Sequence, residues 1–357
     1  MLYELLFFFF VIGCKHGDGD TDERYGWLIE DIDVGSYTGI ERTGIGVDFH
    51  NQVHIGYGGL KHAYNPGGDW TIEEIVTTGG YGGYADMAVG AGTDAHFSFR
   101  DSNTGEMLYV WAPEGVWTTE VIAEENAGGH TAIALDGQNT PYVAWWHNDS
   151  WFQDSTGIGL KYAWRGLSGW NVETVDMEYG TGRGKFASIA LDSGGSPHIA
   201  YLDETAGRLK WAYRDNQAWV IEEVADMDLD SESYTSIAVD RDNNPHILFS
   251  GNMSSYAYRK LGRWHVDKPI STWGSGSLVL SEDDVPHIAF HRLGDYLSYA
   301  TLDGDEWVET ELEMVDPNEH TGRATDIALD HDGHPHISYI NQLTHKTKHA
   351  WYEPEPE

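Results

Sequence analysis

The sequence predicts an all-β protein, a seven-bladed β-propeller of four-stranded antiparallel blades whose ring is closed by the N-terminal strand. A sequence pattern of four short apolar runs recurs seven times along the 357 residues. Its period of about 45 residues is typical of a propeller blade. The clearest copy comprises Ser188–Asp192, Pro197–Tyr201, Leu209–Tyr213 and Trp219–Val224. The last copy stops before its fourth run. A matching run, Trp27–Ile32, stands near the N-terminus, so we expect that strand to complete the last blade.

The repeated positions justify each strand of a blade in turn. The first strand carries a small or short residue between larger apolar ones, as expected where strands converge on the axis: Gly46, Ala88, Ala134, Ala190, Ala238, Val279 and Ala328. A turn rich in Asp, Gly and Asn follows, which favours a hairpin. The second strand opens with one repeated slot: His54, His96, Tyr142, His198, His246, His287 and His336. The fourth strand opens at a Trp: Trp70, Trp117, Trp170, Trp219, Trp264 and Trp307.

Six histidines in one slot raise the question of a metal site. Successive blades place them around a ring, too far apart to meet one ion at the roughly 2.0–2.1 Å that zinc requires, so we predict no metal there. We expect instead a cross-strand hydrogen bond to the Asp that often ends the first strand. These residues are Asp48, Asp136, Asp192, Asp240 and Asp330.

Composition limits the class of binding partner. The chain has 58 acidic and 21 basic side chains, a formal net charge of −37, which argues against nucleic acid because phosphate neutralisation needs clustered Lys and Arg. A well-solvated surface explains the same charge. Cys14 is the only cysteine, so no disulfide can form within the chain. We expect a monomer.

The N-terminus suggests a location. Leu5–Ile12 is apolar but shorter than the roughly 20 residues of a membrane-spanning helix, and it ends in Val11-Ile12-Gly13-Cys14. This resembles the lipobox of bacterial lipoproteins, and the resemblance implies a lipid anchor to the membrane through Cys14. The segment Met1–Glu4 departs from the pattern because it has no Lys or Arg, whereas secretory signals usually begin with positive charge. The alternative is an incidental thiol.

We therefore divide the chain into a lipoprotein signal peptide at 1–14, an acidic tether at 15–24 and the propeller at 25–357. The expected location is the bacterial cell envelope, as an outer-membrane lipoprotein or a secreted protein. Asp18, Asp20 and Asp22 in the tether offer carboxylates that suit calcium, or they only keep the tether solvated. We expect no other cofactor.

Function should reside where the repeats deviate. The largest deviation is Trp146–Asp154, which is predicted to extend the connection between the second and third strands of the third blade. Exposed aromatic rings beside amides and carboxylates suit sugars, whose apolar faces stack on indole. The candidate ligand-binding residues here are Trp146, His147, Trp151 and Phe152. The alternative is that the aromatic rings fold back onto the blade.

The links between blades open on the same side of the ring as this insertion. They carry Arg42, Tyr81, His130, Tyr179, Arg183, Lys185, Trp273, His320 and Arg323. We add Arg183, Trp273 and Arg323 to the candidate ligand site, because cations in an acidic chain can mark an anion site such as one for a carboxylated sugar. Pairing with the abundant local acids is the alternative.

From Trp27 to Trp351 the blades resemble bacterial secreted propellers related to the sialidase and neuraminidase-repeat (BNR-like) superfamily. That superfamily often carries an Asp box ending in Trp on its hairpin turns, and the equivalent turn here, Asp192–Pro197, has no Trp. The resemblance implies a catalytic set of three arginines, a Tyr with a Glu, and an Asp. This set does not map onto the chain residue by residue. Tyr179 beside Glu178, with Arg183 and Arg323, is the nearest match in composition.

Two functions from different classes remain. The first is a binding module for carbohydrate or protein on the loop side of the ring. The second is a sialidase-like glycoside hydrolase or lyase acting on acidic polysaccharide, with Glu178, Tyr179, Asp203 and Glu204 as catalytic candidates. A raised carboxylate pKa in a central pocket favours the enzyme, and a shallow aromatic face favours the binding module.

Overall fold

The computed structural model describes fourteen segments of the chain, which together hold every strand named below. They are residues 25–34, 42–66, 68–75, 85–90, 92–124, 127–148, 157–178, 182–227, 233–250, 254–267, 272–292, 296–314, 325–341 and 344–355. Within these segments no helix has the length and apolar character needed to cross a membrane.

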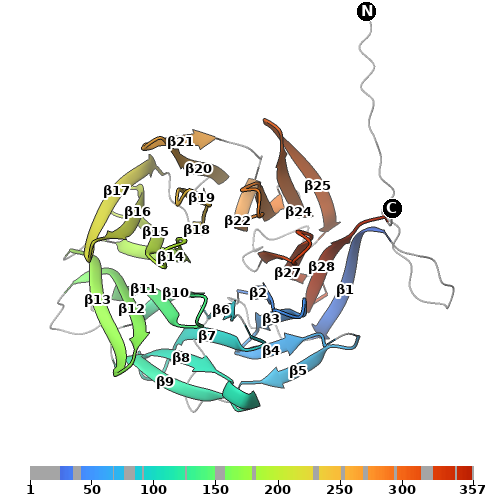
Figure 1. Ribbon diagram of the computed structural model, residues 1–357, viewed down its shortest axis with the longest axis horizontal. Coiled ribbons are helices and arrows are strands. Elements are labelled where there is room, and N and C mark those ends of the chain that lie inside the picture. Colours follow the sequence, from blue (N-terminus) through green and yellow to red (C-terminus); the bar gives the residue numbers. More distant parts are fainter. Residues whose placement is uncertain are drawn as a thin grey trace, which may run out of the picture.

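Seven four-stranded antiparallel sheets form a ring around one axis (Figure 1). The first two blades comprise β2 (Gly44–Val47), β3 (Val53–Tyr57), β4 (Lys61–Tyr64) and β5 (Thr71–Glu74), then β6 (Asp86–Val89), β7 (Ala95–Arg100), β8 (Met107–Trp111) and β9 (Thr118–Ala123). A short 3-10 helix, η1 (Pro113–Gly115), precedes β9. The third and fourth comprise β10 (Ala127–Leu135), β11 (Pro141–Asn148), β12 (Ile158–Gly166) and β13 (Gly169–Glu178), then β14 (Arg183–Leu191), β15 (Pro197–Asp203), β16 (Arg208–Asp215) and β17 (Ala218–Asp226).

The remaining blades follow the same pattern. The fifth and sixth comprise β18 (Tyr234–Val239), β19 (Pro245–Ser250), β20 (Ser254–Lys260) and β21 (Arg263–Asp267), then β22 (Thr272–Leu280), β23 (Pro286–Arg292), β24 (Tyr296–Asp303) and β25 (Glu306–Met314). The seventh comprises β26 (Thr325–Leu329), β27 (Pro335–Asn341), β28 (Lys346–Glu353) and the N-terminal β1 (Gly26–Val34). The predicted fold class is confirmed.

Strand β1 closes the ring as predicted, and it is longer than the expected Trp27–Ile32. It pairs antiparallel with β28, with Trp27 opposite Tyr352, and Figure 1 shows these first and last strands side by side in this blade. The Trp27 ring lies 4.9 Å from that of Tyr299 in the sixth blade. Asp33 accepts a hydrogen bond from Lys61 of the first blade at 2.8 Å. One strand therefore joins three consecutive blades.

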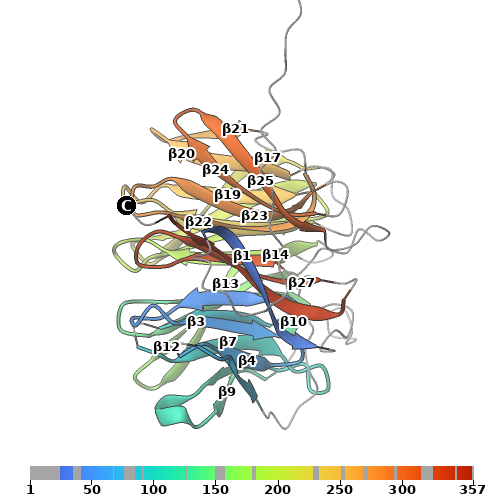
Figure 2. The ribbon, with the colours of Figure 1, turned by 90° about the vertical axis from the view of Figure 1, so that its right-hand side faces the viewer.

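Apolar cores lie between neighbouring blades, which are stacked face to face around the ring (Figure 2). The core between the third and fourth blades, for example, packs Leu160 and Tyr162 of β12 against Ile189 and Ile199 of the next blade. Each sheet is covered on both faces, so its inner strands form near-continuous apolar runs.

A polar clasp joins neighbouring blades near the outer strands. Glu173 on β13 accepts hydrogen bonds from Arg214 at 2.8 Å and from the indole of Trp219 at 3.1 Å, both in the fourth blade. This copy of the Trp that opens the fourth strand thus bonds to the blade before it. The same arrangement recurs at the boundaries on either side, in Glu120 with Arg165 and Trp170 and in Glu222 with Arg259 and Trp264.

The repeated histidine slot has a structural role. His54 and His246 contact the predicted Asp partners, Asp48 and Asp240, at 3.4 and 3.5 Å. The shorter contacts are to an aromatic residue of the third strand that sequence reasoning missed. These pairs are His54 with His62, His96 with Tyr109, His246 with Tyr256, His287 with Tyr299 and His336 with His349.

Candidate functional site

Innermost strands begin, and second strands end, on one face of the ring, which we call the loop face. At the third and fourth blades these innermost strands are bulged on the loop face. The pairing of β10 shifts between Ala127 and Thr131, and that of β14 shifts on both sides of Lys185. His130 and Phe186 adopt left-handed backbone conformations there, with φ of 63° and 52°. Bulges and strained residues redirect side chains and often accompany functional sites.

The predicted insertion Trp146–Asp154 needs a correction. Trp146, His147 and Asn148 are not in a connection but in β11, where Trp146 pairs with Leu160 and Asn148 with Ile158. Aromatic residues favour strand pairing, so the second strand continues further than the sequence repeat indicates. The aromatic residues Trp151 and Phe152 lie outside the described residues.

Trp146 is half-buried at the loop-face end of β11. Its ring packs on Gly128, where an added Cβ would come within 2.5 Å of the indole. The ammonium of Lys185 lies 4.8 Å from the ring centroid and also pairs with Glu204 at 2.7 Å. The indole N–H is buried and has no acceptor in the described part of the chain.

Arg183 is the centre of an ion-pair network beside this ring. Its guanidinium contacts Asp176 at 2.9 Å and Asp203 at 3.1 Å, and it pairs with Glu178. Lys210 lies 3.0 Å from Asp176 and 3.1 Å from Asp203. Glu178 is half-exposed, whereas only 1% of Asp203 is exposed. Asp203 therefore holds the Arg183 guanidinium in place from the buried side of the network.

The network favours the charged forms of Asp176 and Arg183. Burial alone would raise the pKa of Asp176, but the Tyr201 hydroxyl, Lys210 and Arg183 together hold it below its ordinary value. Burial likewise opposes the charge of Arg183, while Asp176, Glu178 and Asp203 raise its pKa.

We name the loop-face cluster as the following residues: Trp146, Asp176, Glu178, Arg183, Lys185, Asp203, Glu204 and Lys210. It brings together five residues predicted from the sequence as site residues: Trp146, Glu178, Arg183, Asp203 and Glu204. Its charged members are four carboxylates and three cations, so it carries a net negative charge and does not attract an anion.

Some contacts of the loop-face cluster recur at other blade boundaries. The residues that make these repeated contacts have a structural role, and the others are specific to this boundary. Tyr201 and Lys210 bond to Asp176 of the preceding blade at 2.7 and 3.0 Å. The same Tyr–Lys–carboxylate arrangement joins two other boundaries, in Tyr57, Lys61 and Asp33 and in Tyr339, Lys348 and Glu313. The distinctive members are Trp146, Arg183, Lys185, Asp203 and Glu204.

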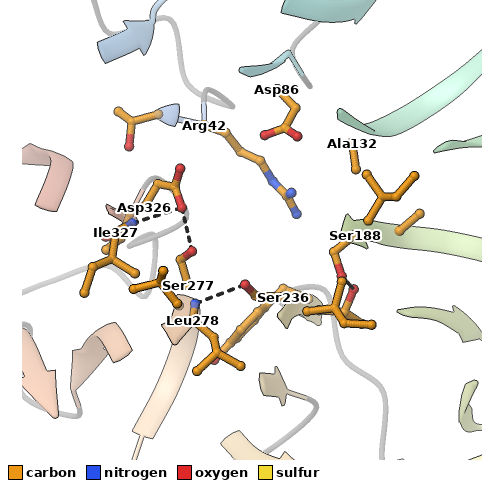
Figure 3. Close-up of a pocket in the computed structure, with 18 of the residues that line it drawn as sticks. Arg42, Asp86, Ala132, Ser188, Ser236, Ser277, Leu278, Asp326 and Ile327 are labelled. Carbon is orange, nitrogen blue, oxygen red and sulfur yellow. Dashed lines mark hydrogen bonds between the residues drawn. The ribbon is translucent and has the colours of Figure 1, made fainter. Parts of the chain in front are cut away.

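A second feature is a cavity of about 210 Å³ on the axis of the ring. Residues near the start of the innermost strands line it. We call it the axial cavity. Figure 3 shows Arg42 extending into it between Asp86 and Asp326. Asp86 accepts the Ile133 amide at 2.8 Å, and Asp326 accepts the Ile45 amide at 2.9 Å. Each carboxylate thus fastens its blade to another innermost strand.

Burial raises the pKa of Asp86 to about 7, although the Ile133 amide and Arg42 oppose the rise and Asp326 adds to it. Burial also raises the pKa of Asp326. Sequence reasoning placed Arg42 in a link and missed both carboxylates. A signal was present, because the position before each inner apolar residue reads Gly44, Asp86, Ala132, Ser188, Ser236, Ser277 and Asp326.

Several predicted residues cannot be placed. Tyr179, Arg323, Tyr81, His320 and Cys14 lie outside the described residues, as do the tether carboxylates and the side chain of Trp273. Those expectations stay predictions. His147 is described and is half-buried in β11.

Potential metal ligands meet at one hairpin turn in the described segments: Asp330, Asp332 and His334. Asp330 already accepts the Asp332 and His334 amides at 2.9 and 2.7 Å and contacts the His334 imidazole at 3.2 Å. These are the contacts of an Asx turn, which needs no ion.

No family model matches the chain, and no curated protein matches it in sequence. Solved structures of similar fold include virginiamycin B lyase from Staphylococcus aureus, 12% identical over 91% of this chain and 99% of that one, with a TM-score of 0.58. The polysaccharide lyase Uly1 is 9% identical over 91% and 93%, with a TM-score of 0.55. The six-bladed fucose-recognising lectin from Aleuria aurantia is 12% identical over 78% and 97%, with a TM-score of 0.54. At these identities the likeness shows the propeller fold alone.

Proposed function

We propose that this protein is a carbohydrate-binding propeller whose ligand lies on the loop-face cluster. The observation that carries the proposal is the contact of Lys185 with both the Trp146 ring and Glu204, at a pair of bulged strands. An aromatic ring edged by an ammonium and a carboxylate offers apolar contact and hydrogen bonds in one place, which suits a sugar ring.

The exposed members can reach a ligand while the buried ones support them. The side chains of Glu178 and Glu204 are 54% and 39% exposed. Beneath them Asp176 and Asp203 hold Arg183 and Lys210 through charge-assisted hydrogen bonds. A rigid support of this kind lowers the cost of ordering side chains when a ligand binds.

The charge of the cluster favours a neutral glycan over an acidic one. Arg183 already has three carboxylate partners, so a carboxylated sugar would compete with groups that are fixed in place. Sugar hydroxyls instead donate to Glu178 and Glu204 and accept from Lys185.

Two of the fold neighbours support carbohydrate as the ligand class. The Aleuria aurantia protein is a fucose-recognising lectin, and Uly1 is a polysaccharide lyase. The support is by analogy of fold, so the argument for this chain rests on its own residues.

The test is a glycan array on the full-length protein, followed by titration of a hit against variants. Lys185→Met keeps the apolar stem and removes the ammonium, and we expect it to weaken binding about tenfold or more, since hydrogen bonds to charged groups contribute roughly 1.5–3 kcal/mol. Trp146→Ala should cost roughly threefold to tenfold through lost ring contact. Lys346→Met is the matched control, because Lys346 pairs with Asp31 at the outer strand of the seventh blade.

Normal binding by Lys185→Met would place the ligand elsewhere. If Trp146→Ala instead melts early while the Lys185 variant binds normally, the ring is a core residue and the proposed site is wrong.

Cleavage of a polysaccharide is a second candidate function, favoured by one observation. Asp86 is a buried carboxylate whose pKa is raised to about 7, and it faces a cavity on the axis. Such a group can act as a general acid near neutral pH. This function predicts that Asp86→Asn abolishes product release from an array-positive polysaccharide, whereas a pure binding module releases no product in either form.

A further inference from the structure

The axial cavity is a chamber built by the innermost strands and is separate from the loop-face cluster. Its volume of about 210 Å³ far exceeds the roughly 10–15 Å³ that suffices for one water molecule. It therefore has room for a small organic molecule of about a dozen heavy atoms.

The lining of the cavity is polar although inner strands are otherwise apolar. It includes Ser188, Ser236 and Ser277 together with Asp86, Asp326 and Arg42. Buried polar groups are costly unless they are hydrogen-bonded, and some of these groups are satisfied by the protein. Ser277 donates to Asp326 at 2.5 Å, and Ser236 accepts the Leu278 amide at 3.0 Å (Figure 3).

The two carboxylates keep acceptor capacity for a guest. A carboxylate offers about four lone-pair sites. The Ile133 and Met87 amides take two sites of Asp86, and Asp326 accepts from Ile45, Ile327 and Ser277. The main-chain bonds fix the two carboxylates at the cavity wall, on either side of the Arg42 side chain.

The mixture of groups selects the class of guest. Two carboxylates against one guanidinium disfavour an anion, and Arg42 disfavours a compact cation. A molecule with adjacent hydroxyls can donate to the carboxylates and accept from the guanidinium and from the Ser236 hydroxyl, which accepts the Leu278 amide.

We propose that the axial cavity binds one neutral, hydroxyl-rich unit of monosaccharide size, as a second subsite of the carbohydrate ligand. This inference rests on the proposed function, and β14 supplies the connection between the two sites. Lys185 lies in the loop-face cluster, and Ser188, three residues later on the same strand, lines the cavity. Even a fully extended chain spans at most about 10 Å over three residues, so the two sites lie within reach of one oligosaccharide.

The test uses free monosaccharides as probes on the full-length protein, by saturation-transfer NMR with titration. The neutral probes are L-fucose, D-galactose, D-mannose and N-acetyl-D-glucosamine, and D-galacturonate is the charged counterpart. We expect at least one neutral sugar to bind and the galacturonate not to bind.

Ala132→Leu is the principal variant because Ala132 lines the cavity and makes no side-chain hydrogen bond (Figure 3). Leucine there fills the space, so neutral-sugar affinity should fall at least tenfold. Ala218→Leu is the matched control, since Ala218 is exposed at the start of β17. If Ala132→Leu melts early, Asp326→Asn replaces it, with the same tenfold loss expected from removal of one negative acceptor.

The outcomes separate this inference from the proposed function. An array hit that depends on Lys185 but is unchanged by Ala132→Leu and Asp326→Asn overturns the axial subsite and leaves the loop-face site intact. An array hit that is weakened by Ala132→Leu but unchanged by Lys185→Met supports the axial subsite and overturns the loop-face site. Failure of every neutral sugar to bind, or equal binding of galacturonate, also overturns the axial subsite.

Discussion

Burial gives two carboxylates of the same network different roles. Asp203 and Glu178 both contact Arg183, and from the sequence alone they are equivalent candidates for acid–base chemistry. In the structure Asp203 is buried between Arg183 and Lys210, whereas the Glu178 side chain is 54% exposed. Asp203 is a positioning residue, and Glu178 is available to a ligand.

The first residue-scale prediction concerns stability. Asp203→Asn takes one partner from the buried Lys210 and from the half-buried Arg183. Both keep Asp176, so we expect a cost below the roughly 3–5 kcal/mol of a fully broken buried pair but above about 1 kcal/mol. Glu178→Gln removes an exposed pair and should cost less than about 1 kcal/mol. Urea unfolding of both variants compares the two costs directly. Equal costs would show that the network is solvated and does not support Arg183 from within.

The histidine slot shows what a single repeated residue can and cannot reveal. Its position in each blade was predictable because the repeat keeps it in register. Its main partners, such as Tyr109 and Tyr299, were not. They stand on the third strand, and which third-strand residue faces the slot depends on hairpin register, which the repeat spacing alone leaves open.

At the scale of elements, β1 is the strand that sequence reasoning placed best, because the missing fourth run of the last copy had a single counterpart. Its contacts extend beyond its own sheet. Glu30 bonds to His349 at 3.0 Å, Trp27 packs in the core of the last two blades, and Asp33 reaches the first blade.

Removal of β1 should therefore destabilise the whole ring. Truncation at Gly35 exposes the edge of β28 and loses the burial of Trp27, Ile29 and Ile32, at roughly 2–3 kcal/mol for each large side chain. Thermal melting of this truncation, against a control that begins at Tyr25 and keeps β1, measures the loss. The two proteins would melt together if the ring closed without this strand.

The bulges of β10 and β14 are the elements that the sequence hid. No residue type in β10 or β14 marks a bulge. Trp146–Asn148 looked like a connection for a different reason, because β11 continues beyond the length of the repeated second strand. His130 and Phe186 carry no residue-type signal for a left-handed backbone, for which glycine would have been the usual marker. The loop-face cluster depends on these irregularities, and for that reason only its members could be predicted, not their arrangement.

At the scale of the whole molecule, ring closure and blade number follow from repeat counting, while the polar interior does not. The repeated position that faces the axis is Gly, Ala, Ser or Asp, and its two Asp residues are the one sign of a polar interior in the repeat pattern. Only the convergence of innermost strands brings Asp86, Asp326 and Arg42 into one cavity.

The pH dependence of stability is also a property of the whole ring. Burial holds the pKa of nine imidazoles below the ordinary value of about 6.5: His54, His62, His96, His198, His246, His287, His291, His336 and His349. Below pH 6.5 the unfolded chain therefore binds protons that the folded protein does not. Stability is full above this pH and falls as the pH falls, by up to about 1.4 kcal/mol per pH unit for each histidine. Asp86 acts in the opposite direction, because its raised pKa favours the folded state on acidification.

We expect the histidines to dominate, so that urea unfolding shows a steep loss of stability between pH 7 and pH 5. His287→Gln should flatten the slope, since burial lowers the pKa of His287 to about 4, whereas the exposed His331 gives a control in His331→Gln. A slope that is flat in the wild type, or unchanged by His287→Gln, would refute buried neutral imidazoles as its cause.

The central claim is that carbohydrate binds on the loop face where the third and fourth blades meet. A crystal structure of the full-length protein with an array-positive oligosaccharide tests it most directly. The account predicts a sugar ring against Trp146 with hydroxyls bonded to Lys185 and Glu204, and the chain directed along β14 toward the axis. A sugar seated on any other blade boundary, with Lys185 still paired to Glu204 and no ligand near it, would contradict the account.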